Sequence, residues 1–176
     1  MKQTDVRILV EGGIMIALAT LLSFIKVFEM PQGGSITAVS MAPILIYSCR
    51  HGVKKGLVVS TVYGILQYLL QGGFSIHPMS ILLDYVLAFG VLGVAGMWKG
   101  RTWMELLGCC VAIVLRYVVL VISGVVVWGS YAPEGVSPLS YSIGYNASYM
   151  IPEGILTMVM IAVLYQKVIR TMKPSV

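Results

Sequence analysis

One carboxylate stands inside a long apolar run of this sequence. Asp84, followed by Tyr85, lies within LLDYVLAFGVLGVAG. A carboxylate inside a membrane costs at least ~2.5 kcal/mol, and it normally faces the interior of a helix bundle and has a partner there. Asp84 is therefore a candidate for contact with a cationic ligand. The alternatives are a structural ion pair with Arg116, in the next apolar run, or a position nearer the membrane interface.

A second group of polar side chains interrupts the apolar sequence between residues 128 and 153. Three- and four-residue steps place four of them on one stripe of a helix, with Tyr141 and Tyr145 beside it. The four are Ser142, Asn146, Tyr149 and Glu153. A buried Asn needs hydrogen-bond partners, and its amide offers donors and acceptors to a heteroaromatic ring. Ligand recognition is one interpretation, and hydrogen bonding between helices is the other.

The apolar run before this stripe carries one further face. Leu120, Gly124 and Trp128 follow at four-residue steps, so the face becomes more aromatic toward one end of the run. Trp128 either lines a pocket or belongs to the aromatic belt at the membrane interface. Arg116 is interpreted as a structural charge that bonds to helix-end carbonyls or to Glu153. A carboxylate together with aromatic faces suits a flat organic cation, because each face adds ~0.5–2 kcal/mol of cation–π attraction.

Composition identifies the environment that these side chains occupy. The chain has 176 residues, of which 58% are hydrophobic and 11% charged, against roughly 25% charged in soluble domains. Its mean hydropathy is +0.90. These values indicate an integral membrane protein whose single domain spans residues 1–176, and whose first apolar run is retained as a span. Topology explains the net charge of +5, so no nucleic-acid partner is expected.

Six apolar segments predict an all-α bundle of six transmembrane helices. The segments cover residues 7–25, 37–49, 53–70, 79–98, 106–128 and 141–168. Ten of the twelve Lys and Arg residues lie before the first segment or at its start, at 50–55, at 99–101 and after 166. Because cytoplasmic segments collect basic residues, both termini are expected inside, and the Gly- and Pro-containing loops at 28–36, 71–78 and 129–140 outside.

Small residues at four-residue spacing mark two of these helices. Gly13 and Ala17 form one such pair, and Gly56, Ser60 and Gly64 form a second series. Small side chains let helices approach closely. The spacing fits packing within the monomer, and it also fits a docking face for another membrane protein.

The residues that usually support catalysis are scarce. The two histidines, His51 and His77, stand in loops, and no zinc-protease motif, phosphate-binding loop or serine nucleophile motif is present. The three cysteines fit neither a disulfide framework nor zinc spacing and are expected to pack as small hydrophobic residues. We therefore expect no enzymatic activity, no metal and no cofactor, and any uphill transport would need a gradient or an energised partner.

Three stretches together resemble a known family. PQGGSITAVSMAPI, HPMSILLDYVLAFGVLGVAG and YAPEGVSPLSYSIGYNASYMIPEG are similar to the thiamin-specific S component, the substrate-binding subunit, of bacterial energy-coupling-factor (ECF) transporters. The resemblance implies a multi-pass protein of the bacterial cell membrane that captures thiamin from outside with high affinity. It also implies three partner subunits, a transmembrane coupling subunit and two cytoplasmic ATPases, and a toppling motion that releases thiamin inside.

The resemblance also implies roles for particular residues. The residues implied in thiamin binding are Asp84, Tyr85, Gly124, Trp128, Tyr141, Ser142 and Asn146. The residues implied in the lid are Gly33, Gly34 and Ser35, and those implied in docking to the coupling subunit are Gly13 and Ala17.

The sequence departs from this family at three positions. Some relatives have His where this chain has Leu120, Trp where it has Gly34, and the longer Glu in place of Asp84. The competing hypothesis is a channel or secondary carrier that moves a small organic cation without partners. A membrane enzyme is a third possibility, which the missing catalytic residues disfavour.

Overall fold

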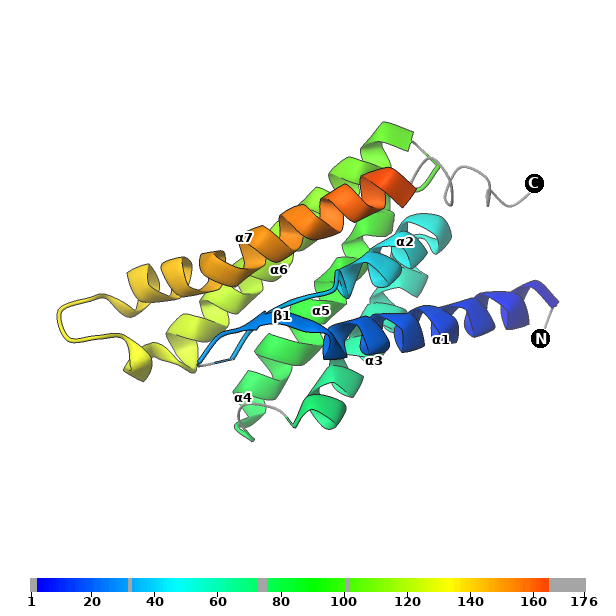
Figure 1. Ribbon diagram of the computed structural model, residues 1–176. Coiled ribbons are helices and arrows are strands. Elements are labelled where there is room, and N and C mark those ends of the chain that lie inside the picture. Colours follow the sequence, from blue (N-terminus) through cyan, green and yellow to red (C-terminus); the bar gives the residue numbers. More distant parts are fainter. Residues whose placement is uncertain (1–2, 32, 73–75, 101, 165–176) are drawn as a thin grey trace.

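The computed structural model describes residues 3–31, 33–72, 76–100 and 102–164 (Figure 1). Within these residues the chain forms the predicted all-α bundle of six helical segments. They are α1 (Gln3–Phe24), α2 (Met41–His51), α3 (Val53–Gln71), the unbroken series α4 (Pro78–Ser80), η1 (Ile81–Leu87), α5 (Ala88–Gly90) and η2 (Val91–Trp98), then α6 (Thr102–Val126) and α7 (Pro138–Leu164).

The fourth segment changes its winding along its length. It begins as an α-helix, continues as the π-helical stretch η1 and ends as the 3₁₀ stretch η2. Asp84 and Tyr85 lie in η1. Because π-helical turns re-aim side chains and are frequent at functional sites, this irregularity falls where the sequence placed its main candidate.

The structure corrects the ends of three predicted spans. The second helix begins at Met41 rather than residue 37, because residues 35–37 form a strand. The fifth ends at Val126, so Trp128 follows the helix instead of ending it. The sixth begins at Pro138 and is described to Leu164, and its predicted end at residue 168 lies outside the described residues.

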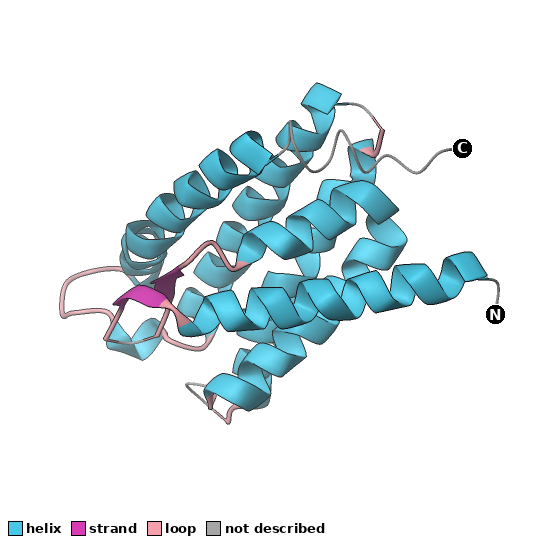
Figure 2. Ribbon diagram, turned by 45° about the vertical axis from the view of Figure 1, so that its right-hand side comes forward, coloured by secondary structure: helices cyan, strands magenta, loops and turns pink. Residues whose placement is uncertain are grey.

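A β-hairpin replaces part of the loop predicted between the first two spans (Figure 2). Strands β1 (Lys26–Glu29) and β2 (Ser35–Thr37) pair antiparallel, with Glu29 opposite Ser35. Gly33 and Gly34 between them adopt φ values of 89° and 90°, which favour glycine. The sequence indicated the turn at these glycines but not the short strands on either side.

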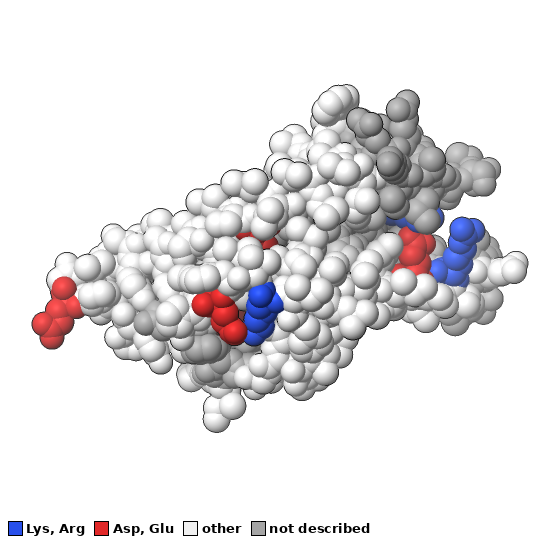
Figure 3. All heavy atoms as spheres, viewed as in Figure 1, with Lys and Arg blue, Asp and Glu red and all other residues white. Residues whose placement is uncertain are grey.

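The exterior of the bundle suits a lipid environment. Four helical stretches among the described residues are long and apolar enough to cross a membrane. They are Asp5–Phe24, Pro78–Trp98, Trp103–Val126 and Pro138–Leu164. The face in Figure 3 shows few Lys, Arg, Asp or Glu side chains over most of its area. The shorter α2 is instead enclosed, with residues 41–49 buried.

The described chain begins and ends at the same end of the bundle (Figure 1). This arrangement fits an even number of membrane crossings. Several basic residues used to orient the chain fall at positions 1–2, 101 and 165–176, outside the described residues. The assignment of this end to the cytoplasm therefore stays a prediction.

The two series of small residues have different environments. A Cβ on Gly56 would approach the side chain of Ser48, and one on Gly64 would overlap the carbonyl of Tyr85. The interpretation of these small residues as packing within the monomer is therefore correct for α3. A Cβ on Gly13 would meet nothing within 4 Å, and Ala17 is exposed, so internal packing does not explain the pair on α1.

The contact between α3 and η2 gives a test of the packing. A Cβ on Gly93 would overlap the backbone of Leu57. We expect Gly93→Ala to lower the free energy of unfolding by ~1–3 kcal/mol, the usual cost of overpacking a core. Thermal unfolding in detergent measures the change.

The matched control for this substitution is Gly144→Ala on α7. Its Cβ would meet nothing within 4 Å, and alanine favours a helix over glycine by ~1 kcal/mol. The control should melt at the same temperature as the wild type or higher. Equal melting of both variants would contradict the packing argument.

Candidate functional site

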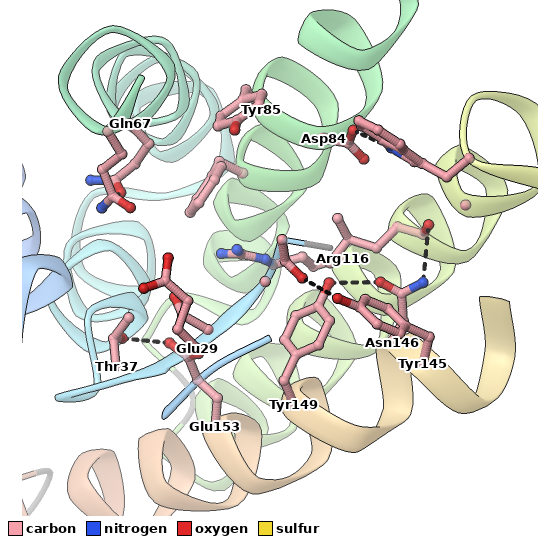
Figure 4. Close-up of a pocket in the computed structure, with 18 of the residues that line it drawn as sticks. Glu29, Thr37, Gln67, Asp84, Tyr85, Arg116, Tyr145, Asn146, Tyr149 and Glu153 are labelled. Atoms are coloured by element: carbon pink, nitrogen blue, oxygen red, sulfur yellow. Dashed lines mark hydrogen bonds between the residues drawn. The ribbon is translucent and has the colours of Figure 1, made fainter. Parts of the chain in front are cut away.

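A cavity of about 210 Å³ lies between the β1–β2 hairpin and the helices (Figure 4). Every residue predicted for ligand binding or for the lid lines it. These are Asp84, Tyr85, Gly124, Trp128, Tyr141, Ser142 and Asn146, with Gly33, Gly34 and Ser35 from the hairpin. The structure thus brings the predicted residues together, although their contact with a ligand remains a prediction.

Asp84 is held by two hydrogen bonds to a single oxygen. Ser80 Oγ donates to its Oδ2 at 2.8 Å, and Trp128 Nε1 donates to the same atom at 3.1 Å. The described residues provide no hydrogen bond to the other oxygen, Oδ1. They also contain no ion pair between Asp84 and Arg116. The carboxylate is therefore fixed in place and keeps capacity for a ligand.

Trp128 is a wall of this cavity. It lies in the turn after α6, where its indole N–H is directed to Asp84. Its ring meets Tyr131 edge to face, with 5.7 Å between the centroids. The interpretation as a pocket wall is therefore favoured over a role confined to the interfacial belt.

A second aromatic wall comes from α7. The rings of Tyr141 and Tyr145 lie 5.8 Å apart, and those of Tyr145 and Tyr149 lie 6.2 Å apart. All three residues line the cavity. With Trp128, they provide the flat surfaces on which an aromatic ligand stacks.

Ser142 and Asn146 make their hydrogen bonds within the protein. Ser142 Oγ donates to the carbonyl of Val121 at 2.9 Å. Asn146 Nδ2 donates to the carbonyls of Leu120 and Ser142, and to Ser142 Oγ, at 2.9–3.4 Å. Asn146 Oδ1 accepts a bond of 2.6 Å from the Tyr149 hydroxyl (Figure 4). Both side chains thus join α6 to α7 and position Tyr149.

Gly124 belongs to the same contact between α6 and α7. A Cβ at this position would overlap Ser142 Oγ. The close approach that Gly124 permits is therefore first of all an approach between helices. Leu120, one turn earlier, is 8% exposed and adds an apolar patch to the cavity wall.

Glu153 ties α7 to the entrance of α2. Its Oε1 accepts hydrogen bonds from Thr37 Oγ1 at 2.7 Å and Ser40 Oγ at 3.5 Å. Between those two residues Val39 has a φ of 58°, a strained value for a β-branched side chain. The carboxylate thus bonds to both sides of a strained turn at the edge of the cavity.

The hairpin rests on α7 through its glycines. The Tyr145 hydroxyl donates to the carbonyl of Gly33 at 2.8 Å. A Cβ on Gly34 would come within 2.6 Å of the Tyr149 ring. Any side chain larger than hydrogen at residue 34 therefore requires the hairpin or the ring to move, so the Trp of some relatives could not occupy this backbone.

Sequence reasoning missed a polar patch on the part of the cavity wall that α1 and α3 form. Gln67 Nε2 and Gln71 Nε2 each donate to Ser23 Oγ at 3.0 Å, and all three residues line the cavity. The two glutamines interrupt the apolar run YGILQYLLQ. Polar residues four apart in a membrane helix were the signal that could have located this wall.

Arg116 was assigned a structural role, and its surroundings differ from that expectation. Its guanidinium carbon lies 3.8 Å from the centroid of the Phe89 ring. Its Nε and Nη1 are buried, and neither has a hydrogen-bond partner among the described residues. The ion pairs within the described chain do not include one to Glu153. Arg116 lines the same cavity as Asp84 (Figure 4).

The described residues contain no group of three or more His, Cys, Asp or Glu side chains arranged to hold a metal ion. Cys49 and Cys109 are buried free thiols with their sulfurs 3.5 Å apart, and Cys110 is exposed. The two buried cysteines fill space in the core, as expected for small hydrophobic residues.

Comparisons with known proteins agree on one family. Residues 9–173 match the family described as "Thiamine transporter protein". The chain is 35% identical to the thiamine transporter ThiT of Bacillus subtilis, over 94% of this chain and 93% of that protein. It is 27% identical to ThiT of Lacticaseibacillus paracasei, over 89% and 86% of the two chains. Its fold resembles the solved structure of ThiT from Listeria monocytogenes with a TM-score of 0.81, at 22% identity and covering 96% and 98% of the chains.

Proposed function

The chain belongs to the thiamine transporter protein family, and from this premise we propose that the cavity beneath the hairpin is its thiamin site. The protein is a thiamin uptake subunit of a bacterial membrane. The observation that carries the assignment of the site is Asp84. Its carboxylate has one oxygen without a described partner and lies in a cavity lined by several aromatic side chains.

Thiamin has the chemistry that this cavity would bind. It joins a cationic thiazolium ring to an aminopyrimidine ring through a methylene group, so it offers two flat aromatic rings and a positive charge. Asp84 would compensate the charge, while Trp128 and Tyr141 would stack on the rings. Each aromatic face contributes ~0.5–2 kcal/mol of cation–π attraction. The hairpin around Gly33 and Gly34 would close over the ligand as a lid.

Transport requires partners that this chain does not supply. We propose that a transmembrane coupling subunit and two cytoplasmic ATPases drive release, as in the ECF transporters that the sequence resembles. Support for the docking site comes from α1, where Gly13 and Ala17 lie exposed in a shallow apolar groove against α3. The groove's other lining residues are Ile16, Thr20, Leu21, Leu66 and Leu70.

Purified protein is expected to bind thiamin by itself, saturably and with a change in tryptophan fluorescence, because Trp128 lines the site. Titration in detergent, read by fluorescence and calorimetry, measures the affinity. Thiamin should be recovered unchanged, since we infer that the subunit is not an enzyme. Absence of saturable binding to the wild type would overturn the proposed function.

Reconstitution separates this function from a self-sufficient carrier. Liposomes that contain the chain alone should bind thiamin but accumulate none in their lumen. Liposomes that also contain the coupling subunit and ATPases should accumulate it when ATP is present on the side of the ATPases. Flux of thiamin through the chain alone would favour the carrier instead.

A further inference from the structure

The polar groups that remain available in the cavity differ from those the sequence indicated. Ser142 and Asn146 each donate a hydrogen bond to a carbonyl of α6. Asn146 makes its other hydrogen bonds to Ser142 and Tyr149 within α7. Five charged residues line the cavity, and they are Lys26, Glu29, Asp84, Arg116 and Glu153. Of these five, Arg116 is the one whose buried polar atoms, Nε and Nη1, have no hydrogen-bond partner within the described chain.

Arg116 is placed so that a ligand can reach it. The residue lines the cavity and keeps part of its surface accessible, while its guanidinium packs over the Phe89 ring at 3.8 Å. In Figure 4 the guanidinium lies among the lining residues, well apart from Asp84. The ring supports one face of the guanidinium and leaves the in-plane N–H donors for an acceptor.

Within the described chain, Arg116 lacks the hydrogen-bond partners that a buried guanidinium normally has. An arginine inside a membrane bundle is costly and normally pairs with an acid or with carbonyl groups. Glu153 interacts electrostatically with Arg116 but forms no ion pair with it, and its Oε1 accepts hydrogen bonds from Thr37 and Ser40. Buried donors without partners carry a further penalty, which a ligand that brings an acceptor removes.

We propose that Arg116 is a specificity residue of the thiamin site, where it donates a hydrogen bond to an acceptor atom of the ligand at a point distant from Asp84. This inference rests on the proposed function of the cavity. Because Arg116 repels the thiazolium and Asp84 attracts it, the two charges set the direction in which thiamin lies. Flat cations that lack an acceptor at the required distance would be rejected, since they leave the guanidinium unpaired.

Thiamin offers two sources of acceptor, its pyrimidine ring nitrogens and its hydroxyl oxygen. The test uses thiamin and two kinds of analogue. In the first a ring nitrogen is replaced by C–H, made separately for each nitrogen, and in the second the hydroxyethyl group is replaced by ethyl. Affinities are measured by calorimetry for the wild type and for Arg116→Met, which keeps an unbranched side chain but has no donor.

One analogue is expected to bind the wild type about tenfold to a hundredfold more weakly than thiamin, the usual loss for a hydrogen bond to a charged group. That analogue and thiamin should bind Arg116→Met with equal affinity. The analogue that loses its penalty identifies the acceptor. Tyr117→Phe is the control on the same helix, because its hydroxyl donates to Ile143 and the residue does not line the cavity. It should keep the wild-type discrimination.

Two results would overturn the role of Arg116. One is that no analogue is penalised by the wild type, and the other is that thiamin and all the analogues weaken by the same factor in Arg116→Met, as a structural role predicts. If Arg116→Met does not fold, Arg116→Lys carries the same test, since it keeps the charge but changes the geometry of donation and should alter the penalty. Absence of thiamin binding to the wild type would instead overturn the proposed function itself.

Discussion

Replacing Asp84 with asparagine is expected to weaken thiamin binding by about a hundredfold or more. Removing one partner of a buried, hydrogen-bonded charge pair costs ~2–5 kcal/mol, and each 1.4 kcal/mol is a factor of ten in affinity. The asparagine oxygen can still accept from Ser80 and Trp128, which donate to the carboxylate in the wild type. The loss therefore reports the charge rather than a collapse of the cavity wall. Calorimetric titration of the purified variant measures it.

Two further variants make this result specific. Asp84→Glu restores the charge one methylene farther out, and it should bind thiamin within about tenfold of the wild type, or ~1.4 kcal/mol. Glu134→Gln changes the net charge equally at an exposed loop residue that does not line the cavity, and it should leave the affinity unchanged. An affinity for Asp84→Asn equal to that of the wild type would remove Asp84 from the site.

The parts of the fold that hydropathy controls could be predicted from the sequence. Six apolar runs gave six helical segments, because a helix is the simplest way to satisfy backbone hydrogen bonds within lipid. Asp84 stood out for the same reason, since a carboxylate in such a run is costly. The short hairpin was not predicted, because strands of four and three residues leave almost no periodic pattern in the sequence.

The roles of individual polar residues were harder to predict, because spacing gives the face of a helix but not what covers that face. Asn146 and Arg116 both lie on faces turned to the cavity, yet the first has its hydrogen bonds satisfied and the second does not. The same limit applies to small residues. Gly64 packs against the carbonyl of Tyr85, whereas Gly13 has open space beside it. Only the arrangement of neighbouring helices separates these cases.

The double substitution Gly13→Leu and Ala17→Leu is expected to abolish uptake while thiamin binding stays unchanged. Two leucines would fill the groove between α1 and α3 that the coupling subunit is proposed to occupy. Helix contacts built on small residues do not tolerate bulky ones, because the backbones can no longer approach closely. Proteoliposomes with the coupling subunit and ATPases should lose at least about 90% of ATP-driven thiamin accumulation, as a contact weakened by ~1.4 kcal/mol or more requires.

The retained functions make this prediction distinct from a loss of folding. Both residues are exposed, neither lines the cavity that holds Asp84, and a Cβ on Gly13 meets nothing within 4 Å. The variant should therefore melt like the wild type and bind thiamin with the same affinity. Ala162→Leu, at an exposed position on α7, adds the same bulk to another outer face and should leave uptake intact. Full uptake by the double variant would mean that lipid, rather than a protein partner, covers this groove.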